Sequence, residues 1–363
     1  MIRFEAVTKK YDDGTTAVDH LDLTAPTGKI TVLVGPSGCG KTTSLRMINR
    51  MITPTSGTVL IDDQDTASLP AAKLRRGIGY VIQHAGLFPH RTIVDNIATV
   101  PVLNGVSRRQ ARTQALELME RVGLSPDFAK RYPAQLSGGQ QQRVGVARAL
   151  AADPPVMLMD EPFSAVDPVV RDQLQDEFLR LQAELGKTIV FVTHDIDEAI
   201  KLGDQIAVLR VGGTLAQLAS PHELLTRPGD AFVAGFVGRD RGYRALGFAD
   251  ADLPVSGEPT VRLGDDVGSG AQWVLVLDHG DAPQGWIDRR TTSGQVTADI
   301  LRRGGTLATQ GGSLRSALDA CLSSPSGRGV VVDDAGRFVG TLRLETVIAR
   351  IEADAAGSQE VPT

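Results

Sequence analysis

A lysine and a threonine follow a glycine-rich turn in the stretch from residue 30 to 46, ITVLVGPSGCGKTTSLR. Gly35 and Gly40, with Lys41 and Thr42, fit the spacing G-x-x-x-x-G-K-[ST] between an apolar strand pattern and a helical pattern. Glycines let backbone N–H groups surround an anion at the positive end of a helix. Lys41 would add a charge for the β- and γ-phosphates of a nucleotide, and Thr42 a hydroxyl for Mg²⁺. The alternative is a strand–helix turn that holds no ligand.

Two adjacent acids, Asp160 and Glu161, end the apolar run Val156–Met159. Buried carboxylates are costly without a cation or a hydrogen-bond donor, so this pair favours a metal site over a capping role. Because side chains alternate along a strand, we expect Asp160 to face Mg²⁺ and Glu161 to face the γ-phosphate. Glu161 is then the candidate base that polarises the attacking water, an effect of about 10²–10⁴-fold.

Polar residues also follow two other predicted strands. Gln83 follows the pattern Gly79–Ile82, and His194 follows Thr188–Val192. Ligands bind at the carboxyl ends of strands in open α/β sheets, so both side chains are candidates for the same edge. For His194 this favours a γ-phosphate contact. The alternatives are a capping amide for Gln83 and an ordinary satisfied polar residue for His194.

The segment Leu136-Ser137-Gly138-Gly139-Gln140 precedes a helical pattern that we expect over Gln140–Ala151. Ser137 and Gln140 fit a capping box, which is a purely structural explanation. Two glycines at a helix start cost stability, however, and they are easier to understand if a phosphate approaches closely there. Near the N-terminus, Tyr11 precedes a turn signal at Asp13-Gly14. Its ring could stack on a base or pack on a sheet edge.

The elements that position these residues alternate between strand and helix patterns. We expect strands at Ile2–Val7, Leu21–Thr24 and Thr58–Ile61, besides those named above, and helices at Lys41–Asn49, Arg108–Val122 and Val170–Leu185, the last ending at Gly186. Strands that alternate with helices predict a parallel α/β sheet.

Composition limits the function classes. The chain has 363 residues, enough for two domains, and two cysteines, Cys39 and Cys321, which fit a reducing compartment without a disulfide framework. No secretory leader follows Met1 and no apolar run is long enough to span a bilayer, so we expect a soluble chain whose membrane role requires a partner. From Ala245 to the end, the chain has 10 arginines and 16 acidic residues, a net charge of −6, while the net charge of the whole chain is −5. This balance argues against a nucleic-acid or anionic-lipid surface there.

The motifs GPSGCGKTT, Gln83, LSGGQ, MDEP, SAVD and VTHD occur in the order and spacing of the ATP-binding-cassette (ABC) family, which residues 1–240 resemble. The resemblance implies a RecA-like P-loop core, an antiparallel β subdomain and a helical subdomain at about 88–152. It implies that Tyr11 stacks on adenine, that Thr42, Gln83 and Asp160 serve Mg²⁺, and that Glu161, His194, Lys41 and Gln83 serve catalysis. The residues that it places on the phosphates of ATP are Gly35, Pro36, Ser37, Gly38, Cys39, Gly40, Lys41, Thr42 and Thr43.

The resemblance also implies partners. Ser137, Gly138, Gly139 and Gln140 would contact the ATP held by a second copy, and Asp167 would act across that homodimer. The segments VIQHAGLFPHRTIVDNI, FVTHDIDEAIKL and GFVGRDR resemble the ATPase subunits of glycine betaine/carnitine/choline importers. Residues 84–96, including Leu87 and Phe88, would then meet a membrane permease at the cytoplasmic face of the membrane. A solute-binding protein outside the cell would act indirectly.

After a linker at 241–253, the C-terminal third holds two similar strand–turn–strand passages, Trp273–Ile287 and Gly329–Leu342. Helical patterns at Ser313–Leu322 and Leu344–Ala353 flank the second passage, and Gly264–Gly270 leaves little room for a helix before the first. Residues 254–354 resemble a tandem of cystathionine-β-synthase (CBS) motifs with a degenerate first motif, before a frayed tail at 355–363. Such modules imply regulation, with a bound nucleotide as one possibility, and a purely structural dimerisation module is the alternative.

The leading function is therefore an ATPase subunit that powers a compatible-solute importer (glycine betaine, carnitine, choline or proline). Two alternatives stay open: an importer of another small solute such as an amino acid, and a non-transport ATP switch. Such switches usually carry two cassettes or a long coiled-coil insertion, and neither pattern occurs here. A binding module with a dead site would lack Glu161 or His194, and both are present.

Overall fold

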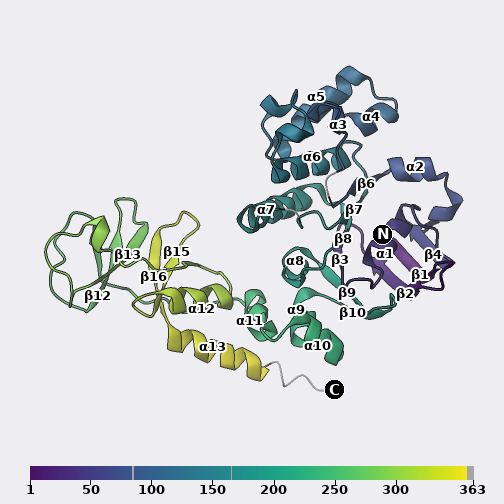
Figure 1. The fold of residues 1–363 in the computed structure, drawn as a ribbon. Helices are drawn as coiled ribbons and strands as arrows, with labels where there is room; N and C mark the ends of the chain where they lie inside the picture. Colours follow the sequence, from purple (N-terminus) through teal and green to yellow (C-terminus); the bar gives the residue numbers. More distant parts are fainter. Residues whose placement is uncertain (84–85, 165, 358–363) are drawn as a thin grey trace. The chain divides into compact units, whose positions relative to one another are not determined.

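The computed structural model describes residues 1–83, 86–164 and 166–357, the last three of these by their backbone alone. The chain forms two compact units, Met1–Val237 and the residues from Gly238 onward (Figure 1). Within the described helices, none has both the length and the apolar composition that crossing a bilayer requires.

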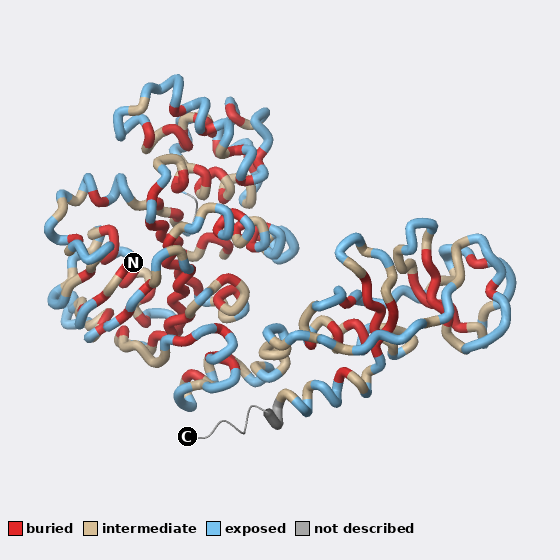
Figure 2. Tube along the Cα trace, turned by 180° about the vertical axis from the view of Figure 1, so that it is seen from behind, coloured by how far each residue is buried: buried red, intermediate tan, exposed pale blue. Residues whose placement is uncertain are grey.

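A six-stranded sheet forms the centre of the first unit, in the order β10-β9-β3-β8-β7-β6. Its strands are β3 (Ile30–Val34), β6 (Ile78–Val81), β7 (Val156–Asp160), β8 (Thr188–Val192), β9 (Gln205–Leu209) and β10 (Leu215–Ala219). All neighbours are parallel except the edge strand β10. Every residue of β3, β7 and β8 is buried, as expected for parallel strands covered on both faces, and Figure 2 shows them as buried segments in the middle of this unit.

An antiparallel sheet in the order β2-β1-β4-β5 lies beside this core. Its strands are β1 (Ile2–Lys10), β2 (Thr16–Ala25), β4 (Ser56–Ile61) and β5 (Gln64–Asp65). Helix α1 (Lys41–Ile48) contacts both sheets, because Leu45, Met47 and Ile48 belong to one buried cluster with apolar residues of each sheet. The glycine-rich turn that begins α1 is therefore fixed between two sheets.

The remaining helices of the first unit surround the sheet. Four of them pack together where we expected a helical subdomain at about 88–152: α3 (Ile93–Ile97), α4 (Thr99–Leu103), α5 (Arg108–Arg121) and α6 (Gly138–Leu150). The others are α2 (Ala71–Arg76), α7 (Pro168–Leu185), α8 (Ile196–Leu202), α9 (Pro221–Thr226) and α10 (Ala231–Val237), with short 3₁₀ turns η1 (Thr66–Ser68), η2 (Pro126–Phe128) and η3 (Pro133–Gln135). Gly186 ends α7 with φ 59°, in the left-handed conformation predicted for that position.

The second unit is built twice from one strand pattern. β11 (Thr260–Arg262) is parallel to β12 (Trp273–Leu277), which is antiparallel to β13 (Pro283–Asp288). In the same way β14 (Ala308–Thr309) is parallel to β15 (Arg328–Val332), which is antiparallel to β16 (Phe338–Arg343). Two helices, α12 (Leu314–Ser323) and α13 (Leu344–Gly357), belong to the second copy, and η5 (Ala298–Ile300) lies between the two.

The hairpin loops of both copies have the same hydrogen bonds. Asp278 and Asp333 each follow the middle strand, and one carboxylate oxygen accepts the backbone N–H groups two and four residues further along. These distances are 2.8 and 2.9 Å in the first loop and 3.0 and 2.8 Å in the second. The two passages that looked similar in sequence therefore share a local structure.

Each hairpin has a glycine where the segment that precedes the other copy passes close to it. A Cβ at Gly285 would lie 3.1 Å from the carbonyl oxygen of Arg302, and one at Gly340 would lie 3.0 Å from that of Ser256. Arg302 bridges to β13 and Ser256 to β16, so each copy pairs with the segment that precedes the other. No helix lies between β11 and β12 among the described residues, as Gly264–Gly270 led us to expect.

The expected linker at 241–253 is instead part of the second unit. It contains α11 (Arg241–Ala245) and the 3₁₀ turn η4 (Leu246–Phe248), both in contact with α12. The Tyr243 hydroxyl donates a hydrogen bond to Asp319, and the Arg315 guanidinium lies 4.7 Å from the centre of the Tyr243 ring. These contacts join residues far apart in the sequence, which explains why the local pattern indicated only a linker.

Candidate active site

The glycine-rich turn connects β3 to α1 and two of its glycines are required by the fold itself. Gly40 has φ +86°, and a Cβ there would lie 2.1 Å from the carbonyl oxygen of Ala17. A Cβ at Gly35 would lie 2.3 Å from the carbonyl oxygen of Leu209. Gly38 also has a positive φ, +78°, but nothing lies within 4 Å of its Cβ position. The open space that an anion needs is therefore at Gly38, while Gly35 and Gly40 allow the chain to pack.

Lys41 folds back over this turn. Its ammonium donates to the carbonyl oxygens of Gly35 at 2.8 Å and Pro36 at 3.1 Å, and the residue is only 8% exposed. No carboxylate in the part of the chain that the structure describes forms an ion pair with it. The carbonyl dipoles of Gly35 and Pro36, with the Cys39 sulfur at 3.8 Å, hold this nearly buried positive charge, an arrangement that suits an incoming anion.

A pocket of about 600 Å³ opens beside the turn. It is lined by Ala17, Ser37, Gly38, Cys39, Gly40, Lys41, Thr42, Thr43, Glu161 and His194. Cys39 is completely buried, and burial raises the pKa of its thiol, partly offset by the charge of Lys41. Cys39 therefore fills space within the turn.

Asp160, the last residue of β7, meets the start of α1. The Thr42 hydroxyl donates to Asp160 Oδ1 at 3.0 Å, and Arg46 Nη2 lies 3.7 Å from Asp160 Oδ2. No group of three or more His, Cys, Asp or Glu side chains among the described residues could hold a metal alone. A hydroxyl and a buried carboxylate that share one hydrogen bond do fit Mg²⁺, which takes few protein ligands and completes its shell with water and phosphate oxygens.

Glu161 lies one residue beyond β7 and joins three strand ends. Its Oε2 atom is 3.2 Å from His194 Nδ1, beyond β8, and 3.2 Å from Gln83 Nε2, beyond β6. The predicted meeting of these side chains at the carboxyl edge of the sheet is present. Contacts of Gln83 with Thr42 or Asp160, which a shared metal would bring, are not among the hydrogen bonds of the described residues.

The direction of Glu161 has a different cause from the one we expected. Its φ is +46°, so the backbone has left the extended conformation and strand alternation does not set the side chain. The Glu161 N–H still donates to Val192 of β8 at 2.9 Å, and Ser164 caps the Glu161 carbonyl through its hydroxyl at 2.9 Å. A non-glycine residue held at positive φ stores strain, which is found most often at functional sites.

The LSGGQ segment lies outside this pocket. Ser137 is exposed and caps α6: its hydroxyl accepts the Gln140 N–H at 3.3 Å, and Gln140 Oε1 accepts the Ser137 N–H at 2.9 Å. The capping box is therefore present, and α6 begins at Gly138, two residues before the predicted start. Gly138 and Gly139 form its first turn, and Asp167 is likewise exposed, capping α7 through the Val169 N–H at 3.0 Å.

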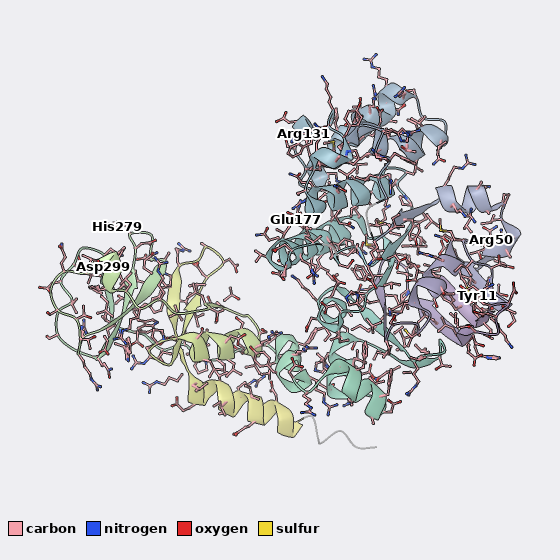
Figure 3. The ribbon with its side chains drawn as sticks, in the orientation of Figure 1. Tyr11, Arg50, Arg131, Glu177, His279 and Asp299 are labelled. Atoms are coloured by element: carbon pink, nitrogen blue, oxygen red, sulfur yellow. The ribbon has the colours of Figure 1, made fainter. Side chains whose placement is uncertain are left out.

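Tyr11 is exposed where β1 runs into the turn before β2 (Figure 3). The residue is 39% exposed, and Lys9 Nζ lies 5.1 Å from the centre of its ring. Tyr11 does not line the pocket, although Ala17 of β2 does. Stacking on a base and packing on a sheet edge therefore both stay predictions for Tyr11.

Two residues near the site were not singled out from the sequence. Arg46, beside Asp160, is four residues after Thr42 and so on the same face of α1, a signal that helical spacing does carry. Ala17 lines the pocket because β2 crosses behind Gly40, and no local pattern indicates it. Three parts of the predicted motifs lie outside the described residues: residue 165 of the motif SAVD, residues 84 and 85 of the segment 84–96, and residues 358–363 of the tail expected at 355–363.

Comparison with known proteins places this geometry in a family. A family model described as ABC transporter matches residues 18–164. The chain is 43% identical over 364 residues to the osmoprotectant import ATP-binding protein OsmV of Salmonella typhimurium, covering 96% of this chain and 95% of OsmV. The chain belongs to the ABC transporter family. As a member of this family it is an ATPase, a subunit that hydrolyses ATP.

Other ABC relatives agree with this assignment. The carnitine transport ATP-binding protein OpuCA of Listeria monocytogenes is 42% identical over 365 residues, covering 96% of this chain and 91% of OpuCA. Among solved structures, the dimeric ATP-binding cassette MJ0796, in a post-hydrolysis state bound to ADP and Pi, superposes with a TM-score of 0.56. It is 36% identical, and the match covers 61% of this chain and 99% of MJ0796. The P-loop α/β cassette fold inferred from the motifs is thus confirmed.

Proposed function

We propose that this ATPase energises the import of compatible solutes of the glycine betaine, carnitine, choline or proline type. The observation that carries the proposal is the extent of the match: similarity to an osmoprotectant import protein and to a carnitine transport protein runs through both units of the chain. A match to the ATPase cassette alone would support ATP hydrolysis without indicating a solute.

The nucleotide site is the pocket at the start of α1. The backbone N–H groups of residues 37–43 and the Lys41 ammonium bind the phosphates, and Tyr11 stacks on the adenine. Thr42, Asp160 and Gln83 would hold Mg²⁺, whose charge would offset that of the phosphates. What supports this assignment is the lone buried charge of Lys41 and the Thr42–Asp160 hydrogen bond beside it.

Hydrolysis is an in-line transfer of the γ-phosphoryl group to water. Glu161 Oε2 orients the water and accepts its proton as the water oxygen forms a bond to the γ-phosphorus. The bond from that phosphorus to the β–γ bridging oxygen breaks, and ADP and phosphate leave. His194 Nδ1, 3.2 Å from Oε2, holds the carboxylate in place and contacts the γ-phosphate through the rest of its ring. Positioning and charge supply the catalysis.

A second copy of the chain completes each site. Ser137, Gly138, Gly139 and Gln140 are outside their own pocket, while the first turn of α6 offers backbone N–H groups at a helix N-terminus, which binds anions. Two cassettes that face each other would bring this turn to the γ-phosphate in the partner. Asp167 is exposed at the start of α7, which leaves it accessible to act across the same interface.

A membrane permease is the partner through which ATP hydrolysis drives transport and which holds the chain at the cytoplasmic face of the membrane. The loop before α3 is its docking site: Phe88 is 38% exposed, and buried Asn96 fixes the loop through the Phe88 N–H at 2.7 Å and carbonyl at 3.1 Å. An exposed aromatic on a fixed loop suits a protein interface. A solute-binding protein outside the cell delivers the solute to the permease.

The second unit is a CBS-like regulatory module, residues 254–354. Support comes from its two strand–turn–strand copies, with matching loops and with reciprocal pairing at Trp286 and Thr341. Among the described residues no helix lies between β11 and β12, so the first copy lacks its leading helix. A bound nucleotide that regulates transport is one function of such a module, and dimerisation alone is the other.

The test is to purify the chain with its permease in lipid nanodiscs and to measure phosphate release with the solute-binding protein present. Glycine betaine, carnitine, choline and proline are compared with polar amino acids such as histidine. Stimulation by one of the first group supports the proposal. Stimulation by an amino acid instead would assign the chain to another importer, and turnover without any permease response would favour a non-transport ATP switch.

A further inference from the structure

Two loops supply the groups on either side of the attacking water. The first runs from Glu161 to Asp167 between β7 and α7, and the second, Thr193 to Asp195, joins β8 to α8. Glu161 itself is held to β8 by its N–H bond to the Val192 carbonyl at 2.9 Å, and its carboxylate lies 3.2 Å from His194. A second connection between the two loops comes from a side chain of α7.

Arg171, in the first turn of α7, reaches both loops. Its Nη2 donates to the Val166 carbonyl in the first loop at 3.0 Å, and its Nη1 lies 3.8 Å from Asp195 Oδ2 in the second. The side chain is 29% exposed, so water screens the ion pair only in part. A single guanidinium thus spans the gap between the loop of Glu161 and the loop of His194.

Asp195 passes this connection to His194. Its Oδ1 caps α8 by accepting the N–H groups of Asp197 at 2.9 Å and Glu198 at 3.3 Å, while its own N–H donates to the Thr193 hydroxyl at 3.0 Å. One oxygen of Asp195 therefore fixes the second loop on α8, and the other faces Arg171. His194, between the two bonded residues, moves with them.

One helical turn beyond Arg171, a buried contact between an amide and a carboxyl group holds α7 and α8 together. Gln175 Nε2 donates to Glu198 Oε1 at 3.1 Å, and both residues are 6% exposed. Burial raises the pKa of Glu198, and the Thr193 hydroxyl and Gln175 lower it by hydrogen bonding. The two helices are thus already fastened without Arg171, so its guanidinium is free to act on the loops.

We propose that Arg171 is a positioning residue that sets the distance between Glu161 and His194 by joining their loops. The inference rests on the proposed catalytic roles of these two residues. A planar fork with separate nitrogens can serve two acceptors at once, whereas a lysine ammonium reaches a single point. Arg171 Nε is buried without a hydrogen-bond partner among the described residues, an arrangement that stability alone would not favour.

The test compares steady-state phosphate release by Arg171→Met, Arg171→Lys and Asp195→Asn with that of the wild-type chain. A misplacement of about 1 Å can cost about 10²-fold, so kcat should fall about tenfold to a hundredfold in Arg171→Met. The KM for ATP should stay unchanged, because the turn at 35–43 holds the phosphates. Arg171→Lys should not restore kcat. Arg180→Met, an exposed arginine on the same helix, is the matched control and should behave as wild type.

Asp195→Asn keeps a capping side chain for α8 and replaces the charged oxygen that faces Arg171 with an NH2 group, which cannot accept from the guanidinium. It should lower kcat in the same direction, and Arg171→Met should then add little to it. A thermal midpoint lowered together with a raised KM, or full rescue by lysine, would reduce Arg171 to a structural role and overturn the inference. A folded Arg171→Met protein with wild-type kcat would also overturn the inference, provided that Glu161→Gln is inactive. If Glu161→Gln keeps wild-type turnover, the proposed catalytic roles of Glu161 and His194 are wrong instead.

Discussion

Replacing Gly139 by alanine separates folding from assembly. Within its own chain the added Cβ would lie 3.3 Å from Val170 Cγ1 and 3.7 Å from Leu174 Cδ1, both side-chain atoms, and Gly139 has no positive φ. Val170 is 40% exposed and can shift. Alanine also favours a helix over glycine by up to about 1 kcal/mol. We therefore expect the thermal midpoint to change by no more than a few degrees.

Across the proposed dimer the same methyl group would stand between the first turn of α6 and the partner's γ-phosphate. Losing one preorganised N–H donor typically costs about 10²–10³ in kcat, and we expect a loss of that size in phosphate release by Gly139→Ala. Gly235→Ala is the matched control, a helical glycine on α10 with nothing within 4 Å of its Cβ position. A stable Gly139→Ala protein with wild-type turnover would refute the idea that α6 completes the partner's site.

Two further predictions concern stability. Hydrogen bonds from Arg112 at 2.9 and 2.8 Å hold the pKa of Asp95 at about 2, so its stabilisation is present above pH 4 and lost as the pH falls toward 2. In urea unfolding at pH 6, we expect Asp95→Asn to be less stable than the wild type by about 1–2 kcal/mol, after allowance for solvent screening. This difference should shrink toward zero between pH 4 and 2. A difference that stays constant would contradict the low pKa of Asp95. Gly40→Ala, which meets the Ala17 carbonyl at 2.1 Å, should lower the thermal midpoint far more than Gly38→Ala, which meets nothing; equal losses would show that backbone strain alone decides.

Parallel strands made the centre of the site predictable. Three apolar runs are followed by polar residues and had to end at one edge of the sheet. There Glu161, which follows one run, contacts Gln83 and His194, which follow the other two. The glycine-rich turn was equally predictable, because its spacing fixes both a strand end and a helix start. In such cases the residue types and the local period carry the whole signal.

Long-range contacts set the parts that were not predictable. The left-handed backbone of Glu161 depends on its bond to Val192 in a neighbouring strand, and the role of residues 241–253 depends on Tyr243 reaching Asp319. Arg171 lies in an ordinary helical pattern and is noticed only when both loops are in view. Ser137 shows another limit, since a capping box and a phosphate-binding turn demand the same residues.

The measurement closest to the central claim is the molar mass of Glu161→Gln by light scattering with ADP and with Mg-ATP. This variant keeps the groups that bind ATP and loses the candidate base, so ATP should persist between two cassettes. The account predicts twice the mass under Mg-ATP relative to ADP, and no such change when Ser137→Arg is added. A Glu161→Gln chain that binds ATP, releases no phosphate and has the same mass with either nucleotide would contradict it.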